Sequence, residues 1–258
     1  MAQTICKALT CLMILFCLST VVHASKIGVN FNTYKNSYWP IPSDWSAGVV
    51  PQTNWNNTSG LPSGGGAVGD TSAIDSPTAG VLVDNQGIAT SVTIDFTGPD
   101  SWRNSSAEGE TGDSRLHAAG LDNSGNSGVG PRVTISDLYT QYPDSPAYDV
   151  YVYVGAERSS RVGSLEINGG DKKYFSTDGD DFSAHIEATA TSAGESTTAS
   201  YVHYRGITGS SFTVTMDNVS GTGTLLRGIQ VVVPESSAVV LLGLGTVLLS
   251  LLRSRRRR

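Results

Sequence analysis

The strongest fold signal in the chain is the stretch Tyr148-Asp149-Val150-Tyr151-Val152-Tyr153-Val154. Successive side chains of a strand point to opposite faces, so the three valines share one face and Tyr151 and Tyr153 share the other. Neither face is strongly polar. The pattern predicts a central strand that is packed on both sides. A second interpretation stays open, in which the two tyrosines line a binding surface.

Short segments of similar character recur on both sides of this strand, and turn-forming Gly, Pro, Asn and Asp residues separate them. No run of ten or more residues shows helical periodicity between the two ends of the chain. The pattern predicts an all-β fold, a β-sandwich or barrel. The further predicted strands are residues 26–31, 80–84, 91–97, 132–138, 163–168, 173–177, 184–189, 201–207, 211–217 and 227–233.

The first 24 residues have the layout of a secretory signal peptide. Lys7 precedes an apolar run over residues 8–22, and the triplet Val22-His23-Ala24 predicts cleavage between Ala24 and Ser25. An uncleaved anchor is the alternative. All 3 cysteines of the chain lie in this segment, so the mature protein is expected to contain no disulfide and no cysteine-based metal site.

The other end carries three features in order: Pro234-Glu235, an apolar run over residues 238–252, and an arginine cluster formed by Arg253, Arg255, Arg256, Arg257 and Arg258. A helix over the apolar run would be about 22 Å long, short of a hydrocarbon core of roughly 30 Å. The unbroken apolar character still favours a transmembrane helix, with the arginines on the cytoplasmic side.

This arrangement resembles the PEP-CTERM sorting signal of Gram-negative bacteria that produce exopolysaccharide, although Ser236 stands where a second proline is usual. The resemblance implies an exosortase-type membrane protease as partner, with processing near Pro234 and Glu235. A plain tail anchor is the alternative. The expected divisions are a signal peptide over 1–24, a β-sandwich domain over 25–232 and a sorting segment over 233–258.

Without its two ends the chain is strongly acidic. The body from Ser25 to Pro234 holds 11 basic and 22 acidic residues, a net charge of −11. Such a surface repels polyanions, which argues against a nucleic-acid partner. Divalent cations and neutral glycans remain compatible with it.

Four tryptophans lie in polar, glycine-rich stretches that are expected to be loops: Trp39, Trp45, Trp55 and Trp102. Sugar rings stack on flat aromatic faces, so these residues are candidate glycan contacts. The competing interpretation is structural, because large aromatic side chains are more often buried.

Two sets of residues suggest further chemistry. One acidic turn holds three candidate calcium ligands, Asp178, Asp180 and Asp181. Calcium is the one cofactor that the sequence suggests. A solvated turn without a metal ion is the alternative. Gly112-Asp113-Ser114 resembles the start of GDS-type esterases, but the late Asp-x-x-His of those enzymes is missing. A turn leading into a strand at Arg115 is therefore expected. His117, His185 and His203 show no ligand spacing and give zinc or triad chemistry little support.

The body also resembles a group of bacterial PEP-CTERM surface proteins, through residues 27–31, 47–57, 112–116, 148–153 and 228–231. That resemblance implies a jelly-roll, galactose-binding-like domain and no particular activity. We therefore expect an exported, non-enzymatic protein. It would pass through an inner-membrane-anchored intermediate and reach the cell surface or extracellular matrix. There its body would be structural or would weakly bind glycan, with extracellular polysaccharide as the expected partner. A secreted glycan-active or ester-active hydrolase on the same fold is the alternative.

Overall fold

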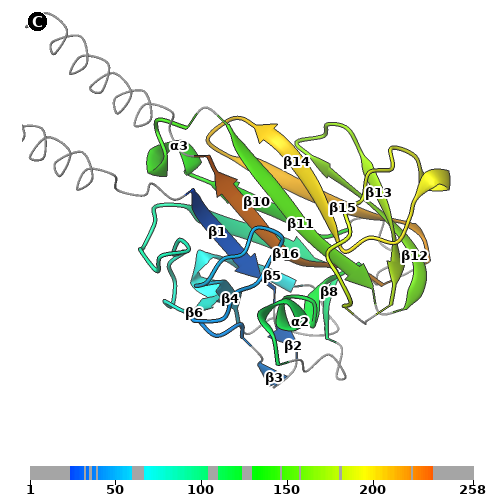
Figure 1. The fold of residues 1–258 in the computed structure, drawn as a ribbon, viewed down its shortest axis with the longest axis horizontal. Coiled ribbons are helices and arrows are strands. Elements are labelled where there is room, and N and C mark those ends of the chain that lie inside the picture. Colours follow the sequence, from blue (N-terminus) through cyan, green and yellow to red (C-terminus); the bar gives the residue numbers. More distant parts are fainter. Residues whose placement is uncertain are drawn as a thin grey trace, which may run out of the picture.

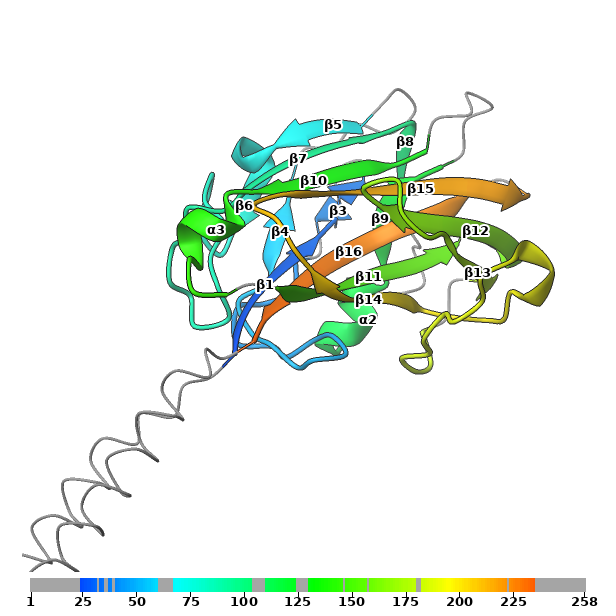
Figure 2. The same ribbon diagram turned by 90° about the horizontal axis from the view of Figure 1, so that it is seen from above.

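A computed structural model describes residues 24–31, 33–34, 37–38, 40–59, 67–103, 110–123, 130–145, 147–156, 158–179, 182–221 and 223–234. Two twisted sheets face each other in this part of the chain (Figures 1 and 2). The first has the order β14-β11-β16-β1-β4-β6, with β9 paired to β16 and β8 paired to β9. Its strands are β14 (Tyr201–Ile207), β11 (Tyr148–Ala156), β16 (Thr224–Val233), β1 (Ser25–Asn30), β4 (Asn56–Thr58), β6 (Ile74–Ser76), β9 (Ala119–Asp122) and β8 (Asp100–Arg103).

The second sheet has the order β13-β12-β15-β10-β7-β5. Its strands are β13 (Lys173–Asp178), β12 (Ser159–Ile167), β15 (Phe212–Ser220), β10 (Arg132–Ser136), β7 (Thr93–Gly98) and β5 (Ala67–Asp70). A separate small pair is formed by β2 (Thr33–Tyr34) and β3 (Ser37–Tyr38). Two short helices, α2 (Gly112–Leu116) and α3 (Leu138–Gln141), and two 3₁₀ turns, η1 (Thr71–Ala73) and η2 (Ala193–Glu195), complete the described elements. The predicted all-β class is confirmed, with two facing sheets.

The main hydrophobic core fills the space between the two sheets. Val150, Val152 and Val154 of β11 enter it from the first sheet. Phe31, directly after β1, meets Phe96 of β7 edge to face, with ring centroids 5.3 Å apart. Alternation along each strand therefore places one face of each sheet in this core, as the sequence pattern requires.

Nine of the eleven predicted strands form, and in both exceptions a side chain takes some of the backbone hydrogen bonds that a neighbouring strand would otherwise make. Around residues 80–84, the Asn56 side chain accepts a hydrogen bond from Val83 N and donates one to Val83 O, so an amide replaces a strand partner. Within 184–189, the Ser200 hydroxyl accepts from Ile186 N and donates to Ala184 O in the same way. Both segments are extended but make isolated bridges instead of a ladder.

The prediction for 132–138 is too long at its C-terminal end. β10 ends at Ser136, because Asp137 adopts a left-handed conformation with φ 66° and α3 begins at Leu138. Several short strands, among them β4, β5, β6, β8 and β9, had no clear alternation in the sequence and were not predicted.

Residues 182–200 run along the side of the sandwich and cover two sheet edges at once. Tyr174 of β13 bridges to Ala190, and Glu187 bridges to Tyr201 of β14. β13 and β14 are the end strands of their sheets. The segment therefore hydrogen-bonds to edges that would otherwise be open to other chains.

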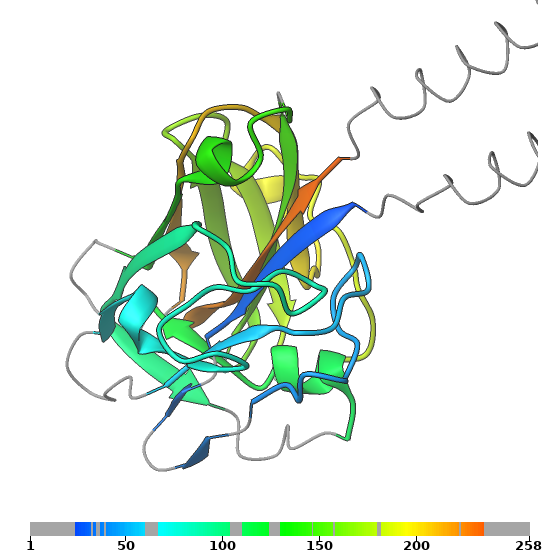
Figure 3. The ribbon, with the colours of Figure 1, turned by 90° about the vertical axis from the view of Figure 1, so that its left-hand side faces the viewer.

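The two described ends of the chain leave the domain side by side. β1 and β16 are antiparallel neighbours, and Ser25 is opposite Val233 in their register (Figure 3). Ala24 and the exposed Pro234 therefore lie at the same end of the sandwich. In the part of the chain that the structure describes, no helix is long and apolar enough to cross a membrane. The predicted transmembrane helix lies outside that part, as do the signal peptide before Ala24, Glu235 and the arginine cluster.

Candidate functional site

The outer face of the first sheet carries a second, smaller hydrophobic cluster. Residues 40–55 and α2 cover this face, and they bury Trp55 and Tyr153 between them and the sheet. Trp55 lies directly over Gly28 of β1, where an added Cβ atom would come within 2.6 Å of the indole ring. Strand β11 is therefore packed on both faces, as the alternation predicted.

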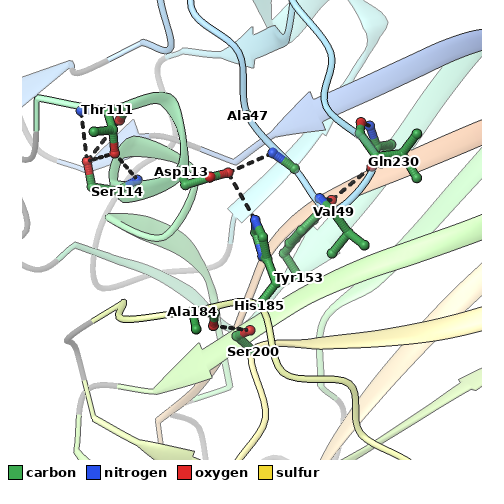
Figure 4. Close-up of polar contacts among 12 residues, drawn as sticks. Ala47, Val49, Thr111, Asp113, Ser114, Tyr153, Ala184, His185, Ser200 and Gln230 are labelled. Carbon is green, nitrogen blue, oxygen red and sulfur yellow. Dashed lines mark hydrogen bonds and ion pairs between the residues drawn. The ribbon is translucent and has the colours of Figure 1, made fainter.

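A buried hydrogen-bond network fixes this cover to the sheet. The Tyr153 hydroxyl accepts from Val49 N at 2.8 Å and donates to Gln230 Oε1 at 2.9 Å (Figure 4). Gln230 Nε2 in turn donates to Val50 O and to Gln52 Oε1. Burial raises the pKa of the Tyr153 phenol far above its usual range, so the hydroxyl keeps its proton and both bonds.

Two histidines lie beside this network although they are far apart in the sequence. His117, directly after α2, stacks on Phe182 with ring centroids 4.2 Å apart, and the ring of His185 lies 5.9 Å away. His185 Nε2 lies 3.1 Å from the Asp113 carboxylate, which also accepts from Gly48 N (Figure 4). Asp113 and His185 are 72 positions apart in the chain, so no local spacing in the sequence could reveal the pair.

His117 is buried, and its Nε2 atom has no hydrogen-bond partner among the described residues. Burial lowers its pKa well below the usual 6.5, and the positive charge of Arg227 and the neighbouring His185 lower it further. A small cavity of about 40 Å³ lies next to it, lined in part by Phe182, Thr177 and Ser200. The neutral imidazole thus helps to hold residues 182–187 against the domain.

The Gly112-Asp113-Ser114 motif forms the helix α2, and the expected turn into a strand at Arg115 is wrong. Thr111 caps the helix, and Ser114 completes a reciprocal capping box with it. The Ser114 hydroxyl donates to Thr111 O at 2.8 Å (Figure 4). Asp113 faces His185 on the other side of the helix. An esterase needs a serine hydroxyl bonded to its base, and Ser114 instead bonds its own helix N-terminus.

Next to this buried cluster, the outer face of β11 and β14 is partly accessible: Asp149, Tyr151 and Glu187 are half-buried and Arg205 is exposed, whereas Tyr201 is buried and packs into the cluster itself. Here Tyr151 stacks on His203 with ring centroids 4.1 Å apart, and Tyr201 lies 6.1 Å from Tyr151. Asp149 bonds His203 Nε2 at 3.1 Å, while Glu187 lies 3.4 Å from both the Tyr201 hydroxyl and the Arg205 guanidinium. We call this surface the outer-face rim; its residues are Asp149, Tyr151, Glu187, Tyr201, His203 and Arg205.

The four tryptophans fall into different environments. Trp55 is fully buried and has no face free for a sugar, which supports the structural interpretation for this residue. Trp45 is half-buried against the same cluster, with the Arg115 guanidinium 5.1 Å over its ring. Trp102 is half-buried on β8, and Trp39 lies outside the described residues. Of the three tryptophans that the structure describes, Trp45 and Trp55 pack in the second cluster and Trp102 lies apart on β8.

Of the three candidate calcium ligands, Asp178 is exposed at the end of β13, and Asp180 and Asp181 lie outside the described residues. Among the residues that are described, no three His, Cys, Asp or Glu side chains form a group that could hold a metal ion. Calcium binding at this turn stays a prediction. Calorimetric titration of the exported protein with calcium tests it, and the absence of both heat and a shift in Tm would contradict it.

No protein-family model and no curated protein matches the chain. Solved structures that resemble it include an exo-β-1,3-galactanase from Phanerochaete chrysosporium with galactose (TM-score 0.29, 16% identity, 58% of this chain and 32% of that one). Another is a calcium-binding mutant of Bacteroides uniformis β-glucuronidase 2 (TM-score 0.33, 14% identity, 81% of this chain and 18% of that one). A third is the Cry4Aa toxin of Bacillus thuringiensis (TM-score 0.26, 14% identity, 52% of this chain and 21% of that one). The chain matches less than a third of the length of each protein, and at these TM-scores the similarities carry no functional argument.

Proposed function

We propose that this chain is an exported, surface-sorted, non-enzymatic protein whose β-sandwich, of the galactose-binding-like jelly-roll type, binds extracellular polysaccharide. The observation that carries the proposal is the outer-face rim. Its half-buried Tyr151 ring lies on a sheet face beside carboxylate and guanidinium groups. Aromatic faces stack on the apolar side of a sugar ring, and the flanking polar groups hydrogen-bond to its hydroxyls.

The shape of the rim favours weak binding without turnover. The Tyr151 ring lies on the outer face of β11, and the neighbouring pocket of about 340 Å³ is lined in part by His203 and Arg205 and not by Tyr151. Small-molecule sites, in contrast, are concave and bury most of the ligand. A long polymer can compensate for a weak single contact, because many protein copies on one cell surface engage it together. The matrix around a polysaccharide-producing cell would provide such a polymer.

Binding is tested with the exported protein on a panel of neutral, acidic and amino polysaccharides. We expect retention on at least one of them, and we expect Tyr151→Ala to abolish it. Tyr174→Ala is the matched control, because Tyr174 is also half-buried on a strand but belongs to the second sheet. Loss of binding in the control and not in Tyr151→Ala would place the site elsewhere.

Sorting is the second part of the proposal, and the fold supports it through the position of the two ends. Ser25 and Val233 are paired neighbours on adjacent strands, so the two expected processing points lie at the same end of the sandwich. We expect the double change Pro234→Ala and Glu235→Ala, or removal of residues 253–258, to leave the protein in the inner membrane. Unchanged processing and surface yield in both variants would refute the exosortase partnership.

A hydrolase is the competing function, and the Asp113–His185 contact is the observation that favours it. A carboxylate that orients a histidine is part of many hydrolytic sites. The position of Ser114 in the capping box argues against it as the nucleophile. Chromogenic esters and glycosides test this directly: turnover that disappears in Asp113→Asn or Ser114→Ala would overturn the non-enzymatic proposal.

A further inference from the structure

The charges at the outer-face rim are unequal. Asp149 and Glu187 place two carboxylates against the rings, and Arg205 is the one cationic side chain among the rim residues defined above. The Arg205 side chain is 65% exposed, so water screens its charge, whereas the Glu187 side chain is 27% exposed. The rim therefore presents more negative than positive charge to a ligand.

Besides burial, the same carboxylates raise the pKa values of the rim tyrosines Tyr151 and Tyr201. Burial is the main reason that the pKa of Tyr151 is raised, and the Asp149 charge raises it further by more than Arg205 lowers it. For Tyr201, burial again comes first, and Glu187 follows through its charge and its hydrogen bond. Carboxylates thus outweigh the guanidinium at both rings.

Aromatic faces add to this preference because their quadrupole attracts cations. The body as a whole carries a charge of −11, which repels polymers of uronic acids or sulfated sugars. Neutral sugars would gain from the aromatic face and from hydrogen bonds to their hydroxyls, while a sugar with an ammonium group would gain in addition from the two carboxylate charges and the overall field.

We infer that the outer-face rim binds a polysaccharide whose sugars carry positively charged amino groups. This inference rests on the proposed polysaccharide binding and adds the chemical class of the ligand. In the bound arrangement, a sugar ring would lie against Tyr151 and its ammonium group would lie near Glu187 or Asp149.

The test compares two ligands with the same sugar backbone. N,N,N-trimethyl chitosan oligosaccharide keeps its positive charge at pH 8, where imidazoles are ordinarily neutral, and fully N-acetylated chitin oligosaccharide is its neutral counterpart. Affinities for the exported protein are measured at about 0.05 M and about 0.5 M salt, which span strong and weak screening. We expect roughly tenfold tighter binding of the charged ligand at low salt and little difference at high salt.

Two substitutions with opposite expected effects test whether the preference for the charged ligand comes from the outer-face rim. Glu187→Gln should weaken binding of the charged ligand roughly fivefold, the upper range for one exposed ion pair, and should weaken binding of the neutral ligand less, because the Gln amide can still hydrogen-bond to sugar hydroxyls. Arg205→Gln should tighten binding of the charged ligand. Asp95→Asn, an exposed carboxylate on β7 of the second sheet, is the control for net charge and should change neither affinity.

The outcomes separate this inference from the proposed function. Equal affinity for both ligands would overturn the charge preference and leave polysaccharide binding in place. A loss in Asp95→Asn as large as in Glu187→Gln would also overturn it, because the effect would then come from net charge. Binding to neither ligand, nor to any polymer of the panel, would refute the polysaccharide proposal itself.

Discussion

The hydroxyl of Tyr153 provides a sharp test of how the second cluster holds residues 40–55 on the sheet. Tyr153→Phe keeps the ring and removes one oxygen. That oxygen accepts from Val49 N and donates to the fully buried Gln230 Oε1, so both groups would lose their partner. Leaving a buried polar group unsatisfied costs about 1–3 kcal/mol. Since Val49 is only half-buried, we expect the free energy of unfolding to fall by about 3 kcal/mol in total.

The matched control is Tyr151→Phe, two positions along the same strand and on the same face. Its hydroxyl has no hydrogen bond among those found in the described residues, and its ring is half-buried. We expect this variant to stay within about 0.5 kcal/mol of the parent protein.

Urea unfolding followed by tryptophan fluorescence measures both variants, because the Trp55 ring lies 5.8 Å from that of Tyr153. A loss of about 3 kcal/mol corresponds to a fall in Tm of roughly 6–12 °C for a domain of this size. Equal stability of the two variants would show that the network contributes nothing, and the account of how the loop is held would be wrong.

Three further perturbations test other parts of the fold. Gly28→Ala would push a methyl group to within 2.6 Å of the Trp55 ring and should cost about 1–3 kcal/mol, while Gly194→Ala, with no atom within 4 Å of the added group, should be neutral in the same unfolding assay. The pKa of His117 is lowered in the folded state, so as the pH falls the unfolded chain takes up a proton at this residue before the folded chain does. The free energy of unfolding should therefore keep its full His117 contribution above pH 6.5 and fall by about 1.4 kcal/mol per pH unit below it, until the lowered pKa is reached. His117→Phe should remove that part of the slope, and an unchanged slope would contradict the assignment. Thr111→Ala removes the cap of α2 and should cost about 1 kcal/mol by denaturant titration; no loss would mean that the cap does not stabilise the helix.

The sequence was informative where a strand alternates over its full length. The valines and tyrosines of β11 could be assigned to opposite faces from the sequence alone, and both faces are packed as expected. The prediction failed where a side chain takes the place of a neighbouring strand, as Asn56 does for Val83. The alternation of apolar and polar residues indicates which side chains are buried, but it does not show which groups accept or donate the backbone hydrogen bonds.

The outer-face rim and the histidine pair depend on contacts between distant parts of the chain. Asp113 meets His185 because α2 and the segment after β13 come to the same face of the first sheet. No spacing rule contains that information. Of the two tyrosines interpreted as a binding surface, Tyr153 is buried, while Tyr151 is half-buried and its role in binding stays a prediction.

The proposal that the rim of this exported domain binds polysaccharide is tested most directly by affinity electrophoresis of the exported protein and its Tyr151→Ala variant through gels that contain the polysaccharides of the panel. We predict that at least one polymer retards the parent protein and that the variant migrates as in a gel without polymer. Free migration of the parent protein in every gel, or equal retardation of the two proteins, would contradict the account.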